Sequence, residues 1–211
     1  MIDFLTRYIS TISLTIGATL SLFNIGYFWK IGLHFLGLID FSNLVYSFGA
    51  SLVALSVAGF ILASVAHFAT SNAKMLFIAL AGAALSTWGI FHFSPRTLVP
   101  EYEANAAILV GFVLSGSAFT AKVRSQPHYV NLRNLSTLAF GWFVIAFQAG
   151  VWQASAELSD RFKYTVSTKS GVIDNVRILR ASSSGFLLAS EGKIIFIPQA
   201  EIKDVTSQTA N

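Results

Sequence analysis

The chain contains no cysteine and has few charged residues. Of its 211 residues, 11% are Asp, Glu, Lys or Arg, whereas 54% are hydrophobic. Without cysteine, the chain forms no disulfide, no thiolate metal site and no thiol nucleophile. A soluble globular domain is about one quarter charged, so this chain has too few charged side chains to cover a surface that faces water. The composition therefore argues against a water-soluble fold.

The sequence also lacks the motifs of common catalytic and binding sites. It has no phosphate-binding loop, no dinucleotide fingerprint, no HExxH zinc motif and no nucleophile elbow. The net charge of +4 comes from scattered residues, and no Lys/Arg-rich segment is dense enough for a nucleic-acid site. We therefore predict no catalytic residue, no cofactor, no metal ligand and no nucleic-acid partner, and we do not expect an enzyme.

Long apolar runs fill most of the remaining sequence. A helix crosses a bilayer with ~20 residues, and five segments reach about that length. The predicted spans are residues 8–29, 44–68, 73–93, 104–121 and 135–156. The intervening segment 30–42 is apolar but carries several polar residues, so we predict an interfacial helix or a buried connection there. Residues 1–156 are thus expected to form an all-α membrane bundle of about five transmembrane helices.

The first run ends in Tyr27-Phe28-Trp29-Lys30. Aromatic residues followed by lysine are typical of the membrane interface, and no small-residue cleavage pattern follows the run. We therefore interpret this segment as a retained helix rather than a cleaved signal peptide.

Small residues recur four positions apart in the predicted spans. Residues four apart share a helix face, and small side chains let helix backbones approach closely in lipid. The candidate helix-packing residues are Ser13, Gly17 and Ser21 in the first span, Ala79 and Ala83 in the third (with Gly82 and Ser86 on an adjoining row), Gly111 and Ser115 in the fourth, and Ala146 and Gly150 in the fifth. These stripes either pack the bundle internally or, in one case, form the interface of a homo-oligomer.

None of the predicted spans has an acidic or basic residue in its middle. Because charges inside a bilayer are kept where protons, ions or substrates move, their absence argues against a proton-coupled transporter. The strongest polar residues near or within the spans are Asn24, Gln148 and Gln153. Each either contacts a pore or substrate or makes an interhelical hydrogen bond, and we favour the hydrogen bond.

Two loop clusters have alternative interpretations. The basic residues Lys122, Arg124 and Arg133 either contact lipid headgroups or a partner, or only orient the protein in the membrane. The second cluster comprises residues with potential ligand atoms on loops of one membrane side: His34, Asp40, His92, Glu101 and Glu103. Because no metal-site spacing joins them, we interpret them as interfacial and solvated side chains.

Residues 157–211 have a different pattern, with frequent charges and short runs of β-branched residues. The predicted strands are residues 162–167, 172–180, 186–190, 193–197 and 202–206, and a helical turn is predicted at 198–201. A β domain of this size buries little apolar surface by itself. We therefore expect it to pack against the bundle, a neighbouring subunit or another protein.

The segment 163–205 resembles the Sm-like β domain of small-conductance mechanosensitive channels. The residues that carry the resemblance are Tyr164-Thr165-Val166, Gly171-Val172-Ile173, Glu191-Gly192-Lys193 and Ile195-Phe196-Ile197-Pro198. The resemblance implies a small SH3/Sm-like barrel on the cytoplasmic side. This chain has Gln199 where the family usually has asparagine, and its fifth span carries bulky aromatic residues. We therefore transfer the fold and not the channel activity.

Basic residues do not decide the orientation of the chain. With a cytoplasmic N-terminus, Arg7, Lys74, Lys122, Arg124 and Arg133 lie inside, against Lys30 and Arg96 outside. Adding Arg161, Lys163 and Lys169, next to the last span, cancels this asymmetry. The resemblance then favours a cytoplasmic β domain.

The sequence therefore predicts a non-enzymatic multi-pass protein, located in a bacterial inner membrane. In the leading hypothesis it is an anchor, sensor or scaffold whose β domain binds a partner protein or a neighbouring subunit. The alternative is a small oligomeric channel or tension sensor with the β domain as a collar. Both hypotheses need the lipid bilayer and assembly with further copies or partners.

We expect the expressed chain to sediment with membranes and to dissolve only in detergent, because residues 8–156 lack the charge to be stable in water. Ultracentrifugation after an alkaline wash, which strips peripheral proteins, is the measurement. A monomer that stays in the detergent-free supernatant would contradict the membrane interpretation.

Overall fold

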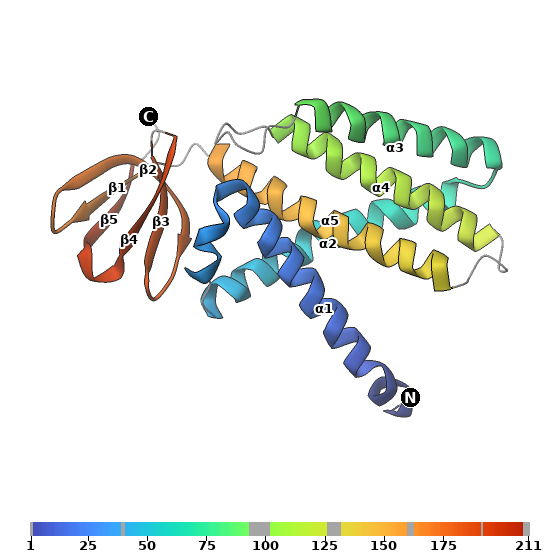
Figure 1. Ribbon diagram of the computed structural model, residues 1–211, viewed down its shortest axis with the longest axis horizontal. Helices are drawn as coiled ribbons and strands as arrows, with labels where there is room; N and C mark the ends of the chain where they lie inside the picture. The colour runs from blue at the N-terminus through green and yellow to red at the C-terminus, as the bar shows by residue number, and fades with distance from the viewer. Residues whose placement is uncertain are drawn as a thin grey trace.

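The computed structural model describes residues 2–38, 41–92, 102–125, 132–159, 163–190 and 192–208. Five long helices form an elongated bundle, and a β domain lies against one end of it (Figure 1). The helices are α1 (Ile2–Ile31), α2 (Phe41–Phe68), α3 (Asn72–His92), α4 (Tyr102–Ser125) and α5 (Leu132–Ser159). The strands are β1 (Lys163–Thr168), β2 (Val172–Ala181), β3 (Gly185–Ser190), β4 (Lys193–Pro198) and β5 (Ile202–Gln208).

Successive helices run in opposite directions along the bundle (Figure 1). The ends of α1, α3 and α5 and the beginnings of α2 and α4 therefore lie toward the β domain. The N-terminal half of α1 projects away from the other helices. Leu14, in this part of α1, is 74% exposed, as expected for a side chain that contacts lipid or another protein rather than this bundle.

Three described helical segments are long and apolar enough to cross a membrane. They are Leu44–Phe68, Asn72–His92 and Glu103–Val123. Few of their residues are buried inside the protein, so most of their apolar surface faces outward. A helix that is apolar all round and exposed is stable in lipid and not in water. Three of the five predicted spans therefore correspond to described helices that are long and apolar enough to cross a membrane.

The predicted interfacial segment after α1 is a short 3-10 helix, η1 (Leu33–Leu38), with no buried residue. It begins after Gly32, whose φ of 128° lies in a region that other residues rarely adopt. The Gly32 amide donates to the Phe28 carbonyl at 2.7 Å, and the Phe35 amide donates to the Gly32 carbonyl. Gly32 therefore ends α1 and turns the chain into η1, as glycine does at many helix ends.

Glycine allows α3 and α4 to pack closely. A Cβ atom on Gly82 would lie 2.7 Å from the Gly111 carbonyl oxygen, and a Cβ on Gly111 would lie 2.6 Å from the Gly82 carbonyl oxygen. Since real Cβ atoms essentially never approach so closely, neither position accepts a larger side chain without moving the helices. Close backbone approach gives the van der Waals contact that holds helices together in lipid.

Glycine also allows α1 and α5 to pack closely. A Cβ on Gly150 would overlap the Phe23 carbonyl oxygen, and a Cβ on Gly26 would overlap the Phe147 carbonyl oxygen. Trp142 Nε1, earlier in α5, donates to Thr19 Oγ1 of α1 at 3.2 Å. The two helices that end at the β domain are thus packed directly against each other.

The β domain is an antiparallel sheet with the strand order β4-β3-β2-β1-β5. Each strand lies within two residues of its predicted range, and a 3-10 turn (Gln199–Glu201) joins β4 to β5 as predicted. The long strand β2 pairs through its first half with β1 and through its second half with β3. In β2, a bulge lies between the residues that pair with Tyr164 and Val166 of β1. It includes Asn175, whose φ is 57°, and it bends the strand. The bend encloses a small apolar core of Val166, Val176, Leu188 and Ile197.

We expect Gly111→Leu to destabilise the bundle, because the new side chain would overlap α3. Overpacking generally lowers the free energy of unfolding by about 1–3 kcal/mol, and by more where the new side chain overlaps backbone atoms. At about 2–4 °C per kcal/mol, the thermal midpoint in detergent should fall by several degrees. The matched control is Gly141→Leu in α5, where a Cβ meets no atom within 4 Å. Equal thermal midpoints for the two variants would contradict this account of α3 and α4.

Candidate functional site

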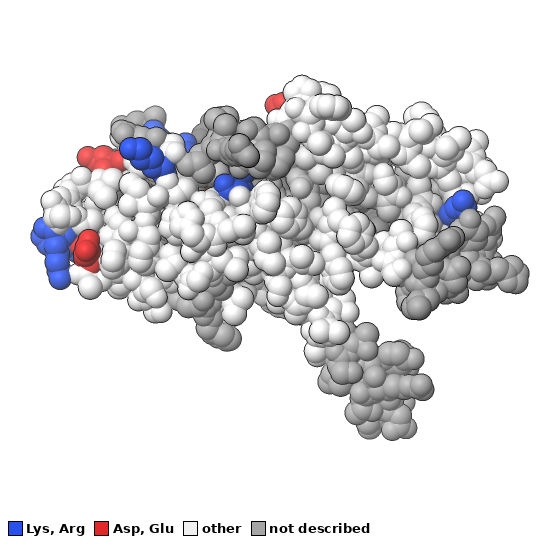
Figure 2. Space-filling view, in the orientation of Figure 1, with Lys and Arg blue, Asp and Glu red and all other residues white. Residues whose placement is uncertain are grey.

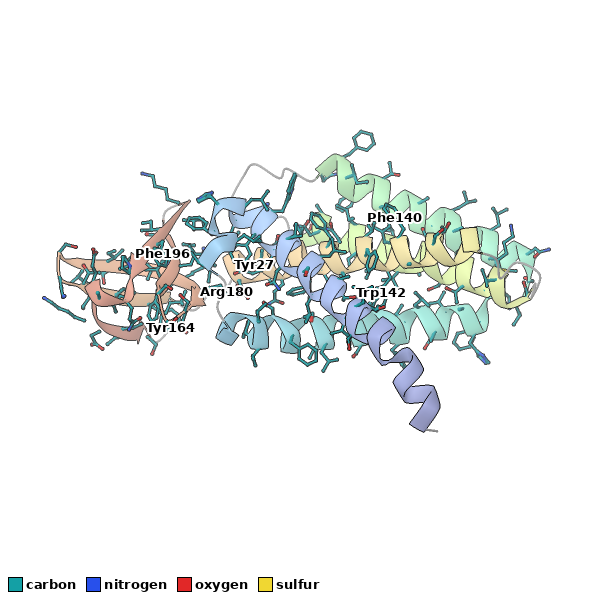
Figure 3. All side chains as sticks on the ribbon, turned by 60° about the horizontal axis from the view of Figure 1, so that its bottom comes forward. Tyr27, Phe140, Trp142, Tyr164, Arg180 and Phe196 are labelled. Carbon is teal, nitrogen blue, oxygen red and sulfur yellow. The ribbon has the colours of Figure 1, made fainter. Side chains whose placement is uncertain are left out.

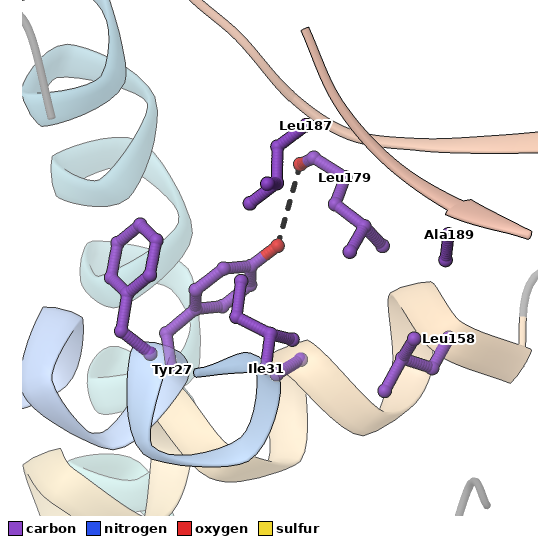
Figure 4. Packing of buried hydrophobic residues seen from close by; sticks show 8 residues of the cluster. Tyr27, Ile31, Leu158, Leu179, Leu187 and Ala189 are labelled. Carbon is purple, nitrogen blue, oxygen red and sulfur yellow. Dashed lines mark hydrogen bonds between the residues drawn. The ribbon is translucent and has the colours of Figure 1, made fainter. Parts of the chain in front are cut away.

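The β domain docks on the bundle through an apolar cluster. Tyr27, Phe28 and Ile31 at the end of α1 and Ala154 and Leu158 at the end of α5 form its helical side. The sheet contributes Leu179 from β2 and Leu187 and Ala189 from β3 (Figure 4). All eight residues are buried, and burial of an apolar side chain contributes about 1.5–3 kcal/mol. This contact fixes the β domain at one end of the bundle.

A second bulge in β2 turns two consecutive side chains toward the helices. Ile178 pairs with Leu188 and Arg180 pairs with Leu187, so Leu179 is the extra residue in β2. In a regular strand, Leu179 and Arg180 would point to opposite faces of the sheet. Here Leu179 joins the apolar cluster and Arg180 also reaches the helices. The bulge therefore places a charged side chain inside an apolar contact.

Arg180 forms a buried ion pair with Glu157 of α5. Its Nη1 donates to both carboxylate oxygens, at 2.9 and 2.8 Å, and the two side chains are 7% and 16% exposed. The guanidinium also lies over two aromatic rings, 3.7 Å from the centroid of Tyr27 and 4.7 Å from that of Tyr46. Tyr27 and Arg180 lie side by side where the bundle meets the sheet (Figure 3).

Glu157 accepts hydrogen bonds from three further side chains. The hydroxyl of Tyr27 donates to Oε2, and the hydroxyl of Tyr46 donates to Oε1 at 3.2 Å. Gln153, one helical turn before Glu157, donates from Nε2 to Oε1 at 2.9 Å. One carboxylate thus connects α1, α2, α5 and β2. We call Tyr27, Tyr46, Gln153, Glu157 and Arg180 the junction cluster.

The surroundings of Arg180 in the junction cluster favour its charged form. Burial by itself would lower the pKa of Arg180, but the neighbouring Tyr27 and Glu157 outweigh burial, so the pKa lies above its ordinary value. Glu157 lies in the last turn of α5, where the helix dipole disfavours a carboxylate. The guanidinium and the hydroxyl donors compensate this cost. Removing either partner would leave a poorly solvated charge.

The protein packs tightly on the β-domain side of Arg180. A cavity of about 10 Å³ lies there between Phe28, Leu38, Arg180, Leu187 and Phe196, which is room for one water molecule at most. Arg180 Nη2 is buried and makes no hydrogen bond with the described part of the chain. This side of the cluster has no space for a substrate. Its arrangement is that of a structural connection.

Two other polar networks lie inside the bundle. Asn105 donates to Ser155 Oγ at 2.8 Å and accepts from Gln148 Nε2 at 3.1 Å, which joins α4 to α5. Ser47 donates to Asn24 Oδ1 at 2.8 Å, which joins α2 to α1. The interhelical hydrogen bonds expected for Asn24 and Gln148 are therefore present, whereas Gln153 bonds within its own helix to Glu157.

The small-residue stripes occupy different surroundings. Ser13, Gly17 and Ser21 of α1 are exposed, and nothing lies within 4 Å of a Cβ at Gly17. In α3, Ala79 is half-buried and Ala83 is exposed, whereas Gly82 makes the close contact. The buried members are Gly111, Ala146 and Gly150, and Ser115 is half-buried against Gly82. The structure thus brings stripes of α3, α4 and α5 into contacts and leaves that of α1 uncovered.

The two loop clusters are described only in part. Lys122 is exposed beside a hollow of about 520 Å³ between α3 and α4, and the side chains of Arg124 and Arg133 lie outside the described residues. Asp40 and Glu101 also lie outside them. His92 Nδ1 is 2.9 Å from the Trp88 carbonyl oxygen, and His34 contacts the ring of Phe35. Within the described ranges, no three potential metal ligands come together.

Sequence reasoning did not identify the junction cluster. Tyr27, Phe28 and Lys30, interpreted as interfacial anchors, are buried, whereas Trp29 is 48% exposed. The sequence nevertheless contains one indication of the cluster. Glu157 is an acidic residue at the end of the last predicted span, four residues after Gln153. A carboxylate there is unfavourable without a cation. The sequence does not say which of the following basic residues supplies the charge.

No protein family, curated protein or solved structure matches this chain. A function for this protein is therefore inferred from the junction cluster and the helix surfaces.

We expect Arg180→Met to loosen the β domain, because Glu157 loses its cation while still largely buried. Breaking a buried ion pair by removing one partner costs about 3–5 kcal/mol. The measurement is the thermal midpoint in detergent together with amide hydrogen exchange in β2 and β3, which should become faster.

The matched control is Lys203→Met, which removes one exposed charge from β5. The double variant Glu157→Leu/Arg180→Met should recover much of the lost stability, since no unpaired charge remains. If Arg180→Met behaves like Lys203→Met, the ion pair does not hold the domain.

Proposed function

We propose that this protein is a non-enzymatic, multi-pass membrane protein that holds its β domain rigidly at one end of a helical bundle. The β domain binds a partner protein or a neighbouring subunit, and the bundle acts as its membrane anchor and sensor. The observation that carries this proposal is the junction cluster, in which one buried carboxylate joins three helices to the sheet.

A purely passive anchor needs no such connection, since a flexible linker would tether the domain equally well. Here the ends of α1 and α5 and the start of α2 all reach Glu157. A shift of any of these helices changes a hydrogen bond or the cation–aromatic contact at Arg180. The arrangement therefore suits the transmission of a bundle movement to the β domain.

The five-span topology belongs to this proposal. Three helices satisfy the length and composition of a span, and α1 and α5 have 30 and 28 residues, pack against each other and end at the β domain. With five crossings, the N-terminus and the β domain lie on opposite sides of the membrane. We place the β domain in the cytoplasm of a bacterium and the bundle in its inner membrane.

The strand order supports an SH3/Sm-like β domain. The last strand pairs with the first, and the long β2 pairs with both β1 and β3, an arrangement that fits a small, partly open barrel. Within the described residues, the outer edges of β4 and β5 pair with no further strand. Unpaired edges of this kind accept a strand from another chain.

The charge distribution supports a water-facing β domain as the binding module. On the face shown in Figure 2, Lys, Arg, Asp and Glu atoms gather on the β domain, whereas few appear on the described part of the helical surface. A partner in water recognises polar and charged surface. The apolar helices contact lipid instead.

A lysine-reactive crosslinker in native membranes tests the proposal. Lys163, Lys169, Lys193 and Lys203 are exposed on the β domain, and Lys74 and Lys122 are exposed at the opposite end of the bundle. We expect mass spectrometry to find crosslinks from the β-domain lysines to one partner or to a second copy. Arg180→Met should reduce them, because the domain loses its fixed position.

The lysines at the far end of the bundle are the internal control. Crosslinks from the β domain that are no more frequent than those from Lys74 and Lys122 would contradict a binding role. Ion flux through vesicles that contain only the purified protein would instead support the channel hypothesis.

A further inference from the structure

A long apolar groove opens on the side of the bundle between α2, α4 and α5. Its volume is about 740 Å³, within the roughly 300–1,000 Å³ typical of small-molecule sites. We call it the lateral groove. Its lining residues are Val45, Tyr46, Gly49, Ala50, Val53, Val57, Ala58, Ile61, Leu109, Val110, Val113, Trp152 and Gln153.

The groove exists because α2 carries small residues where it faces its neighbours. Gly49, Ala50 and Ala58 leave space, and nothing lies within 4 Å of a Cβ at Gly49. The larger residues beside them, Val53 and Val57, line the groove and are 67% and 55% exposed. The groove is thus a gap in the packing of one helix against two others.

The position of the groove selects a lipid as its occupant. Two of its walls belong to the candidate spans Leu44–Phe68 and Glu103–Val123, so the groove opens at the depth of the hydrocarbon. Acyl chains are the solvent at this depth, and a gap with apolar walls fills with the solvent that surrounds it. The walls carry no charge, which suits an uncharged hydrocarbon chain.

The groove has a polar end that matches the polar end of a lipid. Tyr46, near the start of α2, and Gln153, near the end of α5, meet at the β-domain end of the groove. The wall that continues along α2 through Val53 and Val57 to Ile61 is apolar. This one-sided polarity is that of an amphiphile with one polar end and one long tail.

We propose that the lateral groove binds one acyl chain of a phospholipid from the surrounding bilayer. The tail lies along α2 between α4 and α5, and the ester end lies at Tyr46 and Gln153. Both polar residues also donate hydrogen bonds to Glu157. The bound lipid therefore touches two members of the junction cluster, and its effect on the β domain rests on the function proposed above.

Tryptophan quenching by brominated lipid measures the binding directly. Trp152 lines the groove, so a variant with Trp29, Trp88 and Trp142 replaced by phenylalanine reports from this site alone. The protein is reconstituted in vesicles of phosphatidylcholine that carries bromine on its acyl chains. Gly49→Leu fills the groove, and quenching should fall about twofold or more, because brominated carbons no longer contact the indole.

Gly59→Leu is the matched control. Gly59 lies in the same helix, also has open space at its Cβ, and lines a different hollow. Its quenching should equal that of the parent protein. Equal quenching in Gly49→Leu and Gly59→Leu would overturn the proposal.

Native mass spectrometry and cysteine crosslinking complete the test. If the single-tryptophan protein does not fold, native mass spectrometry of the otherwise unchanged chain counts retained phospholipid, which Gly49→Leu should reduce and Gly59→Leu should not. The chain has no cysteine, so Val57→Cys reports contacts between copies without background. A disulfide dimer that Gly49→Leu prevents would show that a second copy fills the groove, and it would overturn the lipid assignment.

Discussion

The carboxylate of Glu157 is the group around which the two halves of the protein are organised. It lies at the end of α5, where the helix dipole disfavours negative charge, and it is largely removed from water. Arg180, Tyr27, Tyr46 and Gln153 supply the compensation, and they come from four separate segments of the chain. The charge can be satisfied only when the bundle and the β domain are both folded and correctly docked. Such a pair adds little net stability but selects one relative position of the two parts.

The surrounding bilayer explains why the helices need glycine where they touch. Lipid gives helices no hydrophobic reason to associate, so close van der Waals contact and interhelical hydrogen bonds must hold them. Gly82 with Gly111 and Gly26 with Gly150 provide the close contacts. Asn105 with Gln148 and Ser155 provides hydrogen bonds in the bundle interior. Neither Gly49 nor Gly59 of α2 makes such a close contact, and the lateral groove lies beside this helix.

The groove and the junction cluster share Tyr46 and Gln153, and this links two parts of the molecule that differ in solvent. The groove is apolar and borders two candidate membrane spans, whereas charged side chains gather on the β domain on the face shown in Figure 2. Tyr46 and Gln153 line the groove and also donate hydrogen bonds to Glu157, so they connect the groove to the junction cluster. The sensing role proposed above requires a path of this kind. Coupling through it needs only small movements of α2, because a hydrogen bond weakens steeply with distance and angle.

The sequence by itself determined three helices that are long and apolar enough to span a membrane, the five strands and the turn before β5, because these depend on local composition and periodicity. It also indicated interhelical hydrogen bonds for Asn24 and Gln148, since an amide in an apolar span needs a partner. It did not reveal that Gly82 rather than Ala83 carries the contact of α3, since both lie on plausible small-residue rows. Only the tertiary structure decided that Arg180 pairs with Glu157, because a bulge in β2 turns that side chain toward the helices. Bulges, helix rotation and the docking of two domains depend on contacts between distant residues, which no local pattern encodes.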